Sequence, residues 1–327
     1  METKRTALIT GGSGYLGSHL AKALKKDGWY VIVLDLKSTL NKYVDLFIAG
    51  DVCDSDKLDS LFAHVPIDVV FHLAGRIEVG ESEKHPTVFW KNNVAGTINL
   101  LDVMKKHGVE NIVYSSSAAV YFPDDGKLNE MSMMTMNNSV YGATKLVSES
   151  AIKQSGLNHI IFRYFNLAGA DIDGEMGEEH EPETHLIPRI LQNLNNFQIY
   201  GDNYNTEDGT CIRDYIHVAD VADAHVLAGN HLLKTKSSDI LNLGTGQGYS
   251  VLQIINLIKD YLKKDVHFSI QPRRQGDPDR LVADATLAGK VLTFTPKYDI
   301  IDIIKSANNW HEKCFRNRYV KKEKQNG

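Results

Sequence analysis

The chain has 327 residues, of which 43% are hydrophobic and 24% are charged, a composition typical of globular proteins and too apolar for a disordered chain. Its length suggests about two domains. The formal net charge of -5 at pH 7 provides no basic field for nucleic acid, and no apolar run approaches the ~20 residues of a membrane-spanning helix.

Short apolar, β-branched runs recur through the first half of the chain, as expected for strands buried on both faces of a parallel sheet. They are Ala7–Thr10, Val31–Leu34, Val69–Phe71, Ile112–Tyr114 and Ile160–Phe162. Amphipathic stretches separate these runs. Residues 1–166 are therefore predicted to form an α/β domain around a doubly wound parallel sheet, the Rossmann fold.

Residues 169–183 are rich in glycine, proline and acidic side chains, which predicts a long loop with solvated carboxylates. This loop opens a smaller, mixed α/β domain over residues 167–327, with some elements returning to the first domain. Within it we expect a strand at 240–242 and helices near 217–233, 250–263 and 298–313.

A glycine-rich loop follows the first predicted strand: Thr10-Gly11-Gly12-Ser13-Gly14-Tyr15-Leu16-Gly17. Gly11 permits a tight turn, Gly14 lets backbone N–H groups approach a pyrophosphate, and Gly17 allows close packing of the next helix. Asp35 ends the second strand, where a carboxylate accepts hydrogen bonds from ribose hydroxyls and repels a 2′-phosphate. The pattern predicts a dinucleotide site for NAD rather than NADP.

Tyr141 and Lys145 are four residues apart on a predicted helix and therefore project from one face. Tyrosine has a pKa near 10, so its use as a base near pH 7 requires roughly 4 kcal/mol of phenolate stabilisation, at about 1.36 kcal/mol per unit. Lys145 and a positively charged nicotinamide ring are expected to provide it. The hydroxyls of residues 115–117 end a strand at the carboxyl edge of the sheet, where such folds bind ligands.

Neither a metal site nor a disulfide framework is predicted. The segment His180-Glu181-Pro182-Glu183-Thr184-His185 has its histidines five apart rather than four, and Pro182 would break a helix that aligned them. The three cysteines are odd in number and widely spaced, which favours the reducing cytoplasm.

Taken together, these features resemble the extended short-chain dehydrogenase/reductase family, also described as NAD-dependent epimerases/dehydratases, and within it most of all the UDP-glucose 4-epimerases. The resemblance covers nearly the whole chain. Its specific motifs are Thr10–Tyr15, Val79–Ser82, Asn92–Val94, Arg163–Asn166, Pro182–Pro188 and Thr206–Val218.

The resemblance implies an NAD-dependent isomerase that interconverts UDP-glucose and UDP-galactose through a 4-keto sugar. Tyr141 would be the acid/base, Lys145 would hold the nicotinamide ribose and tune the tyrosine, and Ser117 would bind the sugar hydroxyl. Further contacts to NAD are implied for Tyr15, Leu16, Asp51, Val52, Leu73, Ala74, Gly75, Asn93, Ser115 and Phe165.

A second set of residues is implied to bind the UDP-sugar: Asn166, His185, Leu186, Tyr200, Arg213, Arg274 and Asp277. The arginines suit this role, because a planar guanidinium holds a diphosphate in bidentate fashion. Leu281 matches the family's gate beside C2 of the sugar. Because leucine is smaller than tyrosine, UDP-GlcNAc and UDP-GalNAc are expected as a slower second substrate pair. The family also implies a homodimer through helices near 86–107 and 139–155.

Three departures from the family pattern are visible. Arg76 and Ile77 stand where an apolar residue and a cofactor-binding lysine usually follow Ala74-Gly75. Phe122 occupies a position commonly held by glycine, and the segment after Asp35 is shorter than in many members.

Alternative functions are less well supported. A nucleotide-sugar 4,6-dehydratase or decarboxylase needs a further acid/base pair after the serine strand, where Ser117-Ala118-Ala119 carries no carboxylate. A non-catalytic NAD sensor would be expected to lose Tyr141 or Lys145, and both are present. An epimerase whose main substrate is UDP-GlcNAc/UDP-GalNAc or another nucleotide sugar remains the alternative within the same chemistry.

Overall fold

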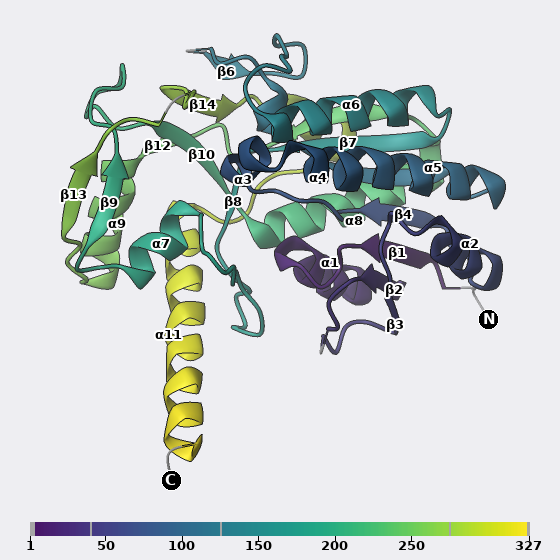
Figure 1. Cartoon of the computed structure of the whole chain (residues 1–327), viewed down its shortest axis with the longest axis horizontal. Coiled ribbons are helices and arrows are strands. Elements are labelled where there is room, and N and C mark those ends of the chain that lie inside the picture. Colours follow the sequence, from purple (N-terminus) through teal and green to yellow (C-terminus); the bar gives the residue numbers. More distant parts are fainter. Residues whose placement is uncertain (1–3, 40, 125, 275, 326–327) are drawn as a thin grey trace.

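The computed structural model describes residues 4–325 except 40, 125 and 275, with side chains described as far as Cys314. Its centre is a seven-stranded parallel sheet in the order β11-β7-β5-β4-β1-β2-β3 (Figure 1). The strands are β1 (Thr6–Thr10), β2 (Tyr30–Asp35), β3 (Leu46–Ala49), β4 (Val69–His72), β5 (Asn111–Ser117), β7 (Asn158–Tyr164) and β11 (Asp239–Leu243). The predicted doubly wound α/β class is confirmed.

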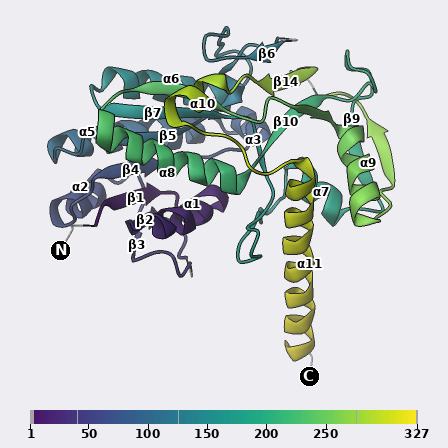
Figure 2. The same ribbon diagram turned by 180° about the vertical axis from the view of Figure 1, so that it is seen from behind.

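Helices cover both faces of this sheet (Figure 2). One face carries α1 (Tyr15–Lys26), α8 (Val218–Thr235) and α10 (Thr286–Leu292), whose apolar side chains join one buried cluster. The other carries α2 (Ser55–His64), α5 (Gly96–Lys106) and α6 (Val140–Gln154), which join a second cluster. The strands are buried on both sides, which is why their sequences are continuous apolar runs.

Strand β3 was absent from the sequence prediction, because it is a short edge strand whose four side chains are partly or fully exposed. Strand β11 and helix α8, which were predicted within the second domain, are elements that return to the first, as the prediction allowed without saying which. β11 pairs with β7 along its whole length, and α8 packs on α1 and on the strands of the central sheet. The boundary at residue 166 itself stays a prediction.

A second layer of structure is built around β10 (Ile212–His217), which pairs with β8 (Asn166–Ala168), β12 (Gly248–Ser250) and β14 (Arg280–Ala283). β14 also pairs with β6 (Lys127–Leu128), and a separate pair consists of β9 (Phe197–Tyr200) and β13 (Phe268–Gln271). The accompanying helices are α7 (Leu186–Gln192), α9 (Val251–Leu262) and α11 (Ile300–Gln325). α11 is longer than predicted and projects away from the body (Figure 1).

Among the described residues, no helix combines the length and apolarity that crossing a membrane requires.

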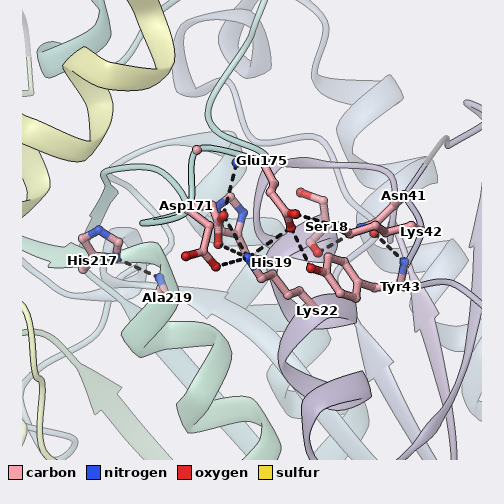
Figure 3. A network of polar contacts seen from close by, with 12 residues as sticks. Ser18, His19, Lys22, Asn41, Lys42, Tyr43, Asp171, Glu175, His217 and Ala219 are labelled. Atoms are coloured by element: carbon pink, nitrogen blue, oxygen red, sulfur yellow. Dashed lines mark hydrogen bonds and ion pairs between the residues drawn. The ribbon is translucent and has the colours of Figure 1, made fainter. Parts of the chain in front are cut away.

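The acidic loop between β8 and α7 is anchored on α1 by ion pairs (Figure 3). Lys22 Nζ lies 2.8 Å from carboxylate oxygens of Asp171 and Asp173 and 3.2 Å from Glu175 Oε2. The lysine is buried, and its contacts with these carboxylates raise its pKa despite burial. The prediction of solvated carboxylates is therefore wrong for Asp171, which is 9% exposed.

Four buried histidines make the fold sensitive to acid. Burial lowers the pKa of His72 to about 3 and the pKa values of His19, His217 and His225 to about 4. In the unfolded chain these groups titrate near 6.5, so below that pH the unfolded state binds more protons, and stability falls until the folded-state pKa values are reached.

We therefore expect the free energy of unfolding to fall between pH 7 and pH 5 by up to about 2 kcal/mol for each of these histidines. Urea denaturation at the two pH values measures it. His225→Gln should lose less stability on acidification than the parent. Equal pH dependence in the parent and the variant would contradict the argument.

Candidate active site

The glycine loop after β1 has the geometry of a phosphate cradle. Gly11 has φ +74°, and a Cβ there would lie 2.7 Å from the backbone nitrogen of Ala74, so only glycine fits. A Cβ at Gly17 would lie 2.5 Å from the Gly11 carbonyl oxygen. Gly14 is the N-cap of α1, and the first N–H groups of this helix lack intrahelical acceptors and carry partial positive charge. The loop therefore suits a pyrophosphate.

Asp35 and Tyr15 lie beside this loop in different ways. The Asp35 carboxylate accepts hydrogen bonds from the N–H groups of Ser13 at 3.0 Å and Lys37 at 2.9 Å, so it stays at the end of β2 next to the glycines. The Tyr15 hydroxyl instead donates to the Gly169 carbonyl at 2.6 Å. The side chain of Tyr15 thus faces the acidic loop, and a cofactor contact from this position falls to its backbone.

The other predicted cofactor residues share one location, the carboxyl ends of adjacent parallel strands. Strand β3 is followed by Asp51 and Val52, strand β4 by Leu73, Ala74 and Gly75, and strand β7 by Phe165. Ser115 lies near the C-terminal end of strand β5. This edge is where open α/β sheets bind ligands.

Asn93 is the exception, because it lies in the π-helical segment Trp90–Ala95. Its amide oxygen accepts from the Arg76 N–H at 2.8 Å, and its amide nitrogen donates to the Arg76 carbonyl at 3.0 Å and to Thr144 Oγ1 at 3.1 Å. Asn93 therefore ties the segment after β4 to α6.

A buried hydrogen-bond chain that sequence reasoning missed supports Asn93. The Thr97 hydroxyl donates its one hydrogen to the Asn93 carbonyl at 2.6 Å. In its contact with His72 Nε2 at 2.9 Å it must therefore accept, so His72 Nε2 is the donor. His72 Nδ1 then accepts from Thr10 Oγ1 at 2.7 Å. A histidine within an apolar strand gives no sequence signal of this role, because its partners come from β1 and α5.

Tyr141 and Ser117 are brought together by a close helix approach. Ser139 caps α6 by accepting from the Gly142 N–H at 3.0 Å. A Cβ at Gly142 would lie 2.5 Å from the Ala119 carbonyl oxygen, so glycine allows α6 to reach the short 3₁₀ turn Ala118–Val120 that follows Ser117. Burial raises the pKa of Tyr141 to about 12, and the Ser117 hydroxyl acts in the opposite direction.

Lys145 lies one turn further along α6 and faces the same edge. Its Nζ donates to the Ser115 carbonyl at 2.7 Å and lies 5.9 Å from the centre of the Tyr141 ring. Burial lowers the pKa of Lys145 to about 8. Lys145 was expected to help lower the Tyr141 pKa, but within the protein alone burial dominates and the group that opposes it is Ser117. A Cβ at Gly75 would lie 3.5 Å from Lys145 Nζ, so this ammonium borders the predicted cofactor site.

A buried ion pair joins helix α6, which carries Tyr141 and Lys145, to strand β7 of the central sheet. Glu149 continues the Tyr141, Lys145 face of α6, and its carboxylate accepts from Arg163 of β7, with Nη2 2.6 Å from Oε2. Both side chains are at most 1% exposed. Glu149 also accepts a short hydrogen bond from Ser116. The four-residue spacing on α6 was a usable signal for this pair, but its partner could be identified only from the fold.

Four predicted substrate residues come together in two contacts. Arg213 of β10 lies 3.3 Å from Asp277 Oδ1, and Arg274 stacks on Tyr200 with its guanidinium carbon 4.2 Å from the ring centre. Arg274 and Asp277 line a cavity of about 830 Å³.

The remaining predicted substrate residues lie on nearby elements. Asn166 of β8 and Leu281 of β14 both belong to strands paired with β10, where Leu281 is in register with Arg213. Leu281 packs against the cluster that contains Phe165. His185 is the N-cap of α7, and Leu186 begins that helix.

The family departures have distinct positions. Arg76 and Ile77 follow β4, and the side chains of both are exposed rather than buried in the site. Phe122 is 51% exposed and lines the same cavity as Arg274 and Asp277. A position commonly held by glycine therefore carries an aromatic ring at the predicted substrate cavity.

The histidines of the acidic loop lie together, contrary to the spacing argument against them. That argument assumed a helix, whereas residues 178–185 form a loop. One ligand atom from each of Glu178, His180, Glu183 and His185 lies within 4.8 Å of all the others. In a loop, side chains need no helical spacing to converge.

Comparison with known proteins gives consistent relatives. Residues 7–244 match the NAD dependent epimerase/dehydratase family. The UDP-glucose 4-epimerase of Lactobacillus helveticus is 43% identical over 319 residues, which cover 93% of this chain and 96% of that protein. The UDP-glucose 4-epimerase of Bifidobacterium longum, solved with NAD+ and UDP, is similar with a TM-score of 0.89 and 35% identity over 94% of this chain and 98% of its own. The UDP-Glc/GlcNAc 4-epimerase of Campylobacter jejuni has a TM-score of 0.80 and 33% identity over 95% and 100% of the two chains.

Proposed function

The chain belongs to the NAD-dependent epimerase/dehydratase family, and from its site we infer that it interconverts UDP-glucose and UDP-galactose. The observation that carries this function is the meeting of Tyr141, Ser117 and Lys145 at the carboxyl edge of the sheet, beside a glycine loop. The arginine-lined cavity adds a place for a nucleotide diphosphate, because guanidinium groups pair with phosphates in bidentate fashion.

NAD fits the residues at this edge. The glycine cradle and the free N–H groups of α1 suit its pyrophosphate, Asp35 suits a ribose diol, and Lys145 borders the position of the nicotinamide ribose. Bound NAD supplies reversible hydride transfer at C4 of the sugar, by way of a 4-keto sugar.

The protein's own residues move one proton in this reaction. Tyr141 accepts the proton of the sugar 4-hydroxyl and later returns it, and Ser117 holds that hydroxyl in place. Because burial raises the Tyr141 pKa to about 12, the phenolate needs positive charge close by. Lys145 Nζ, 5.9 Å from the centre of the ring, is a cation of the chain that can provide part of this charge.

The function is tested by incubating the purified protein with UDP-galactose and no added NAD, followed by separation of the products. We expect UDP-glucose to form, and NAD to be released only on denaturation, because the cofactor is regenerated in each cycle. Failure to convert either sugar, with no nicotinamide in the denatured protein, would refute the proposal. A requirement for stoichiometric added NAD would refute the tightly held cofactor.

The range of sugars that the protein accepts is proposed to depend on Leu281. This residue pairs with Arg213 in the register of β14 and β10, and it packs against the cluster that contains Phe165. A tyrosine there would fill the space that an acetamido group needs. Leu281→Tyr should lower kcat/KM for UDP-GlcNAc by about 10- to 200-fold relative to UDP-glucose, the usual range for a pocket clash. UDP-glucose turnover in the same variant is the control. An unchanged ratio would remove Leu281 from the gate.

The same proposal covers the roles of the two domains, the oligomeric state and the location of the protein. Residues 1–166 with β11 and α8 hold NAD, and most of the remainder holds the UDP-sugar. A homodimer through the 86–107 and 139–155 helices is supported by exposed Val88 and Ile98, 41% and 43% accessible, on the first of these segments. Sedimentation equilibrium would measure the mass. The dispersed cysteines favour a cytoplasmic location.

A further inference from the structure

The loop before α7 gathers two histidines and two glutamates, of which only His185 is also a predicted UDP-sugar residue. His180 Nδ1 lies 3.2 Å from Glu178 Oε1 and 3.6 Å from Glu183 Oε1. His185 Nδ1 makes a close contact with the same Glu178 oxygen and lies 3.9 Å from Glu183 Oε1. One ligand atom from each of the four residues thus lies within 4.8 Å of the others, close enough to surround a single small cation.

The two carboxylates of this cluster are buried, so their negative charge needs compensation. The side chains of Glu178 and Glu183 are each only 3% exposed. The Oε2 atoms of both carboxylates are buried with no hydrogen-bond partner. Two buried carboxylates with unmet oxygens are costly unless a positive charge compensates them.

The cluster can meet this requirement with protons on its imidazoles or with a metal ion. Protons on the imidazole nitrogens face the Oε1 atoms and leave both Oε2 atoms without partners, whereas a metal ion can bind either oxygen of each carboxylate and compensate the charge of both.

We propose that Glu178, His180, Glu183 and His185 bind one Zn²⁺ ion through two imidazole nitrogens and two carboxylate oxygens. Four ligands of this mixed type suit tetrahedral Zn²⁺, whereas Mg²⁺ and Ca²⁺ prefer oxygen ligands alone. Because all four positions come from the protein, the site is structural and leaves no place for a reacting water.

The ion would fix the loop between the predicted cofactor and substrate regions. The ring of Tyr15, which begins α1 beside the glycine loop, packs on His180 with centroids 6.5 Å apart. His185, on the other side, occupies the N-cap position of α7. Lys22 already anchors the first half of the same loop through Asp171, Asp173 and Glu175, so the ion would hold the second half.

The experiment measures metal in the full-length chain without an affinity tag. After dialysis in metal-free buffer, the parent should retain about one Zn²⁺ per chain by mass spectrometry. Glu183→Gln should retain at least tenfold less, whereas Glu181→Gln, at an exposed carboxylate two residues away, should match the parent. After chelator treatment, Co²⁺ should bind with the visible absorption of a tetrahedral complex, and Zn²⁺ should displace it.

The parent protein by itself decides the outcome if a variant fails to fold. Less than a tenth of an equivalent of Zn²⁺, together with no saturable one-to-one binding of Zn²⁺ or Co²⁺ to chelator-treated parent, would overturn the proposal and leave a proton-bridged cluster. Zn²⁺ should also raise the parent Tm by at least about 3 °C, since a ligand of the native state alone stabilises it. These readouts do not depend on the epimerase activity.

Discussion

Replacing Tyr141 by phenylalanine is expected to lower the rate of epimerisation by at least about 100-fold, the usual contribution of general acid–base catalysis. The ring, which is 8% exposed at the start of α6, keeps its packing, so the fold and the NAD content should be unchanged. Only the group that carries the sugar proton is lost. The measurement is kcat for UDP-galactose, with NAD content determined on the same sample.

Tyr114→Phe is the matched control for this variant. Tyr114 is a buried tyrosine of β5 whose ring also lies near Lys145, 5.0 Å from Nζ, but its hydroxyl has no part in the mechanism. It should retain most of the parent activity. If Tyr141→Phe also turned over near the parent rate, another group would have to carry the proton.

Breaking the Arg163–Glu149 pair is expected to have the largest effect on stability. Removal of one partner leaves an uncompensated charge among side chains that are at most 1% exposed, which typically costs about 3–5 kcal/mol. Arg163→Met and Glu149→Gln should each lower the free energy of unfolding by about this amount. Urea denaturation near pH 7 provides the measurement.

The double variant Arg163→Met/Glu149→Gln measures how strongly the two charges depend on each other. With both charges removed, the loss should be clearly smaller than the sum of the two single losses, because neither charge is left unpaired. The exposed pair Lys84–Glu81 serves as comparison, and Lys84→Met should cause no measurable loss. Additive losses for Arg163 and Glu149 would mean that the two charges do not compensate each other.

The cofactor half of the molecule could be predicted from the sequence because its signals are local. The turn at Gly11, the close packing at Gly17 and the acid at Asp35 are all set within one strand–helix–strand unit. Tyr141 and Lys145 share a face because helix geometry places residues four apart together. The family resemblance added the substrate residues, whose roles remain proposals.

The predictions that failed or were incomplete concern contacts between distant segments. The acidic loop was predicted to be solvated, but Asp171 pairs with Lys22 from α1. Some elements of residues 167–327 were expected to return to the first domain but were not identified, and hydrogen bonds to β7 make the 240–242 strand one of these. In each case the deciding partner lies far away in the sequence.

The sequence by itself therefore determined the fold class and the glycine loop, and it predicted the catalytic side chains, because each depends on local spacing and backbone conformation. Only the tertiary structure decided the environment of those side chains. The pKa of Tyr141 rises and that of Lys145 falls because surrounding elements exclude water from both. Glu178, His180, Glu183 and His185 converge because a loop, not a helix, connects them. Desolvation and convergence both depend on atoms brought together from separate parts of the chain, which residue spacing cannot express.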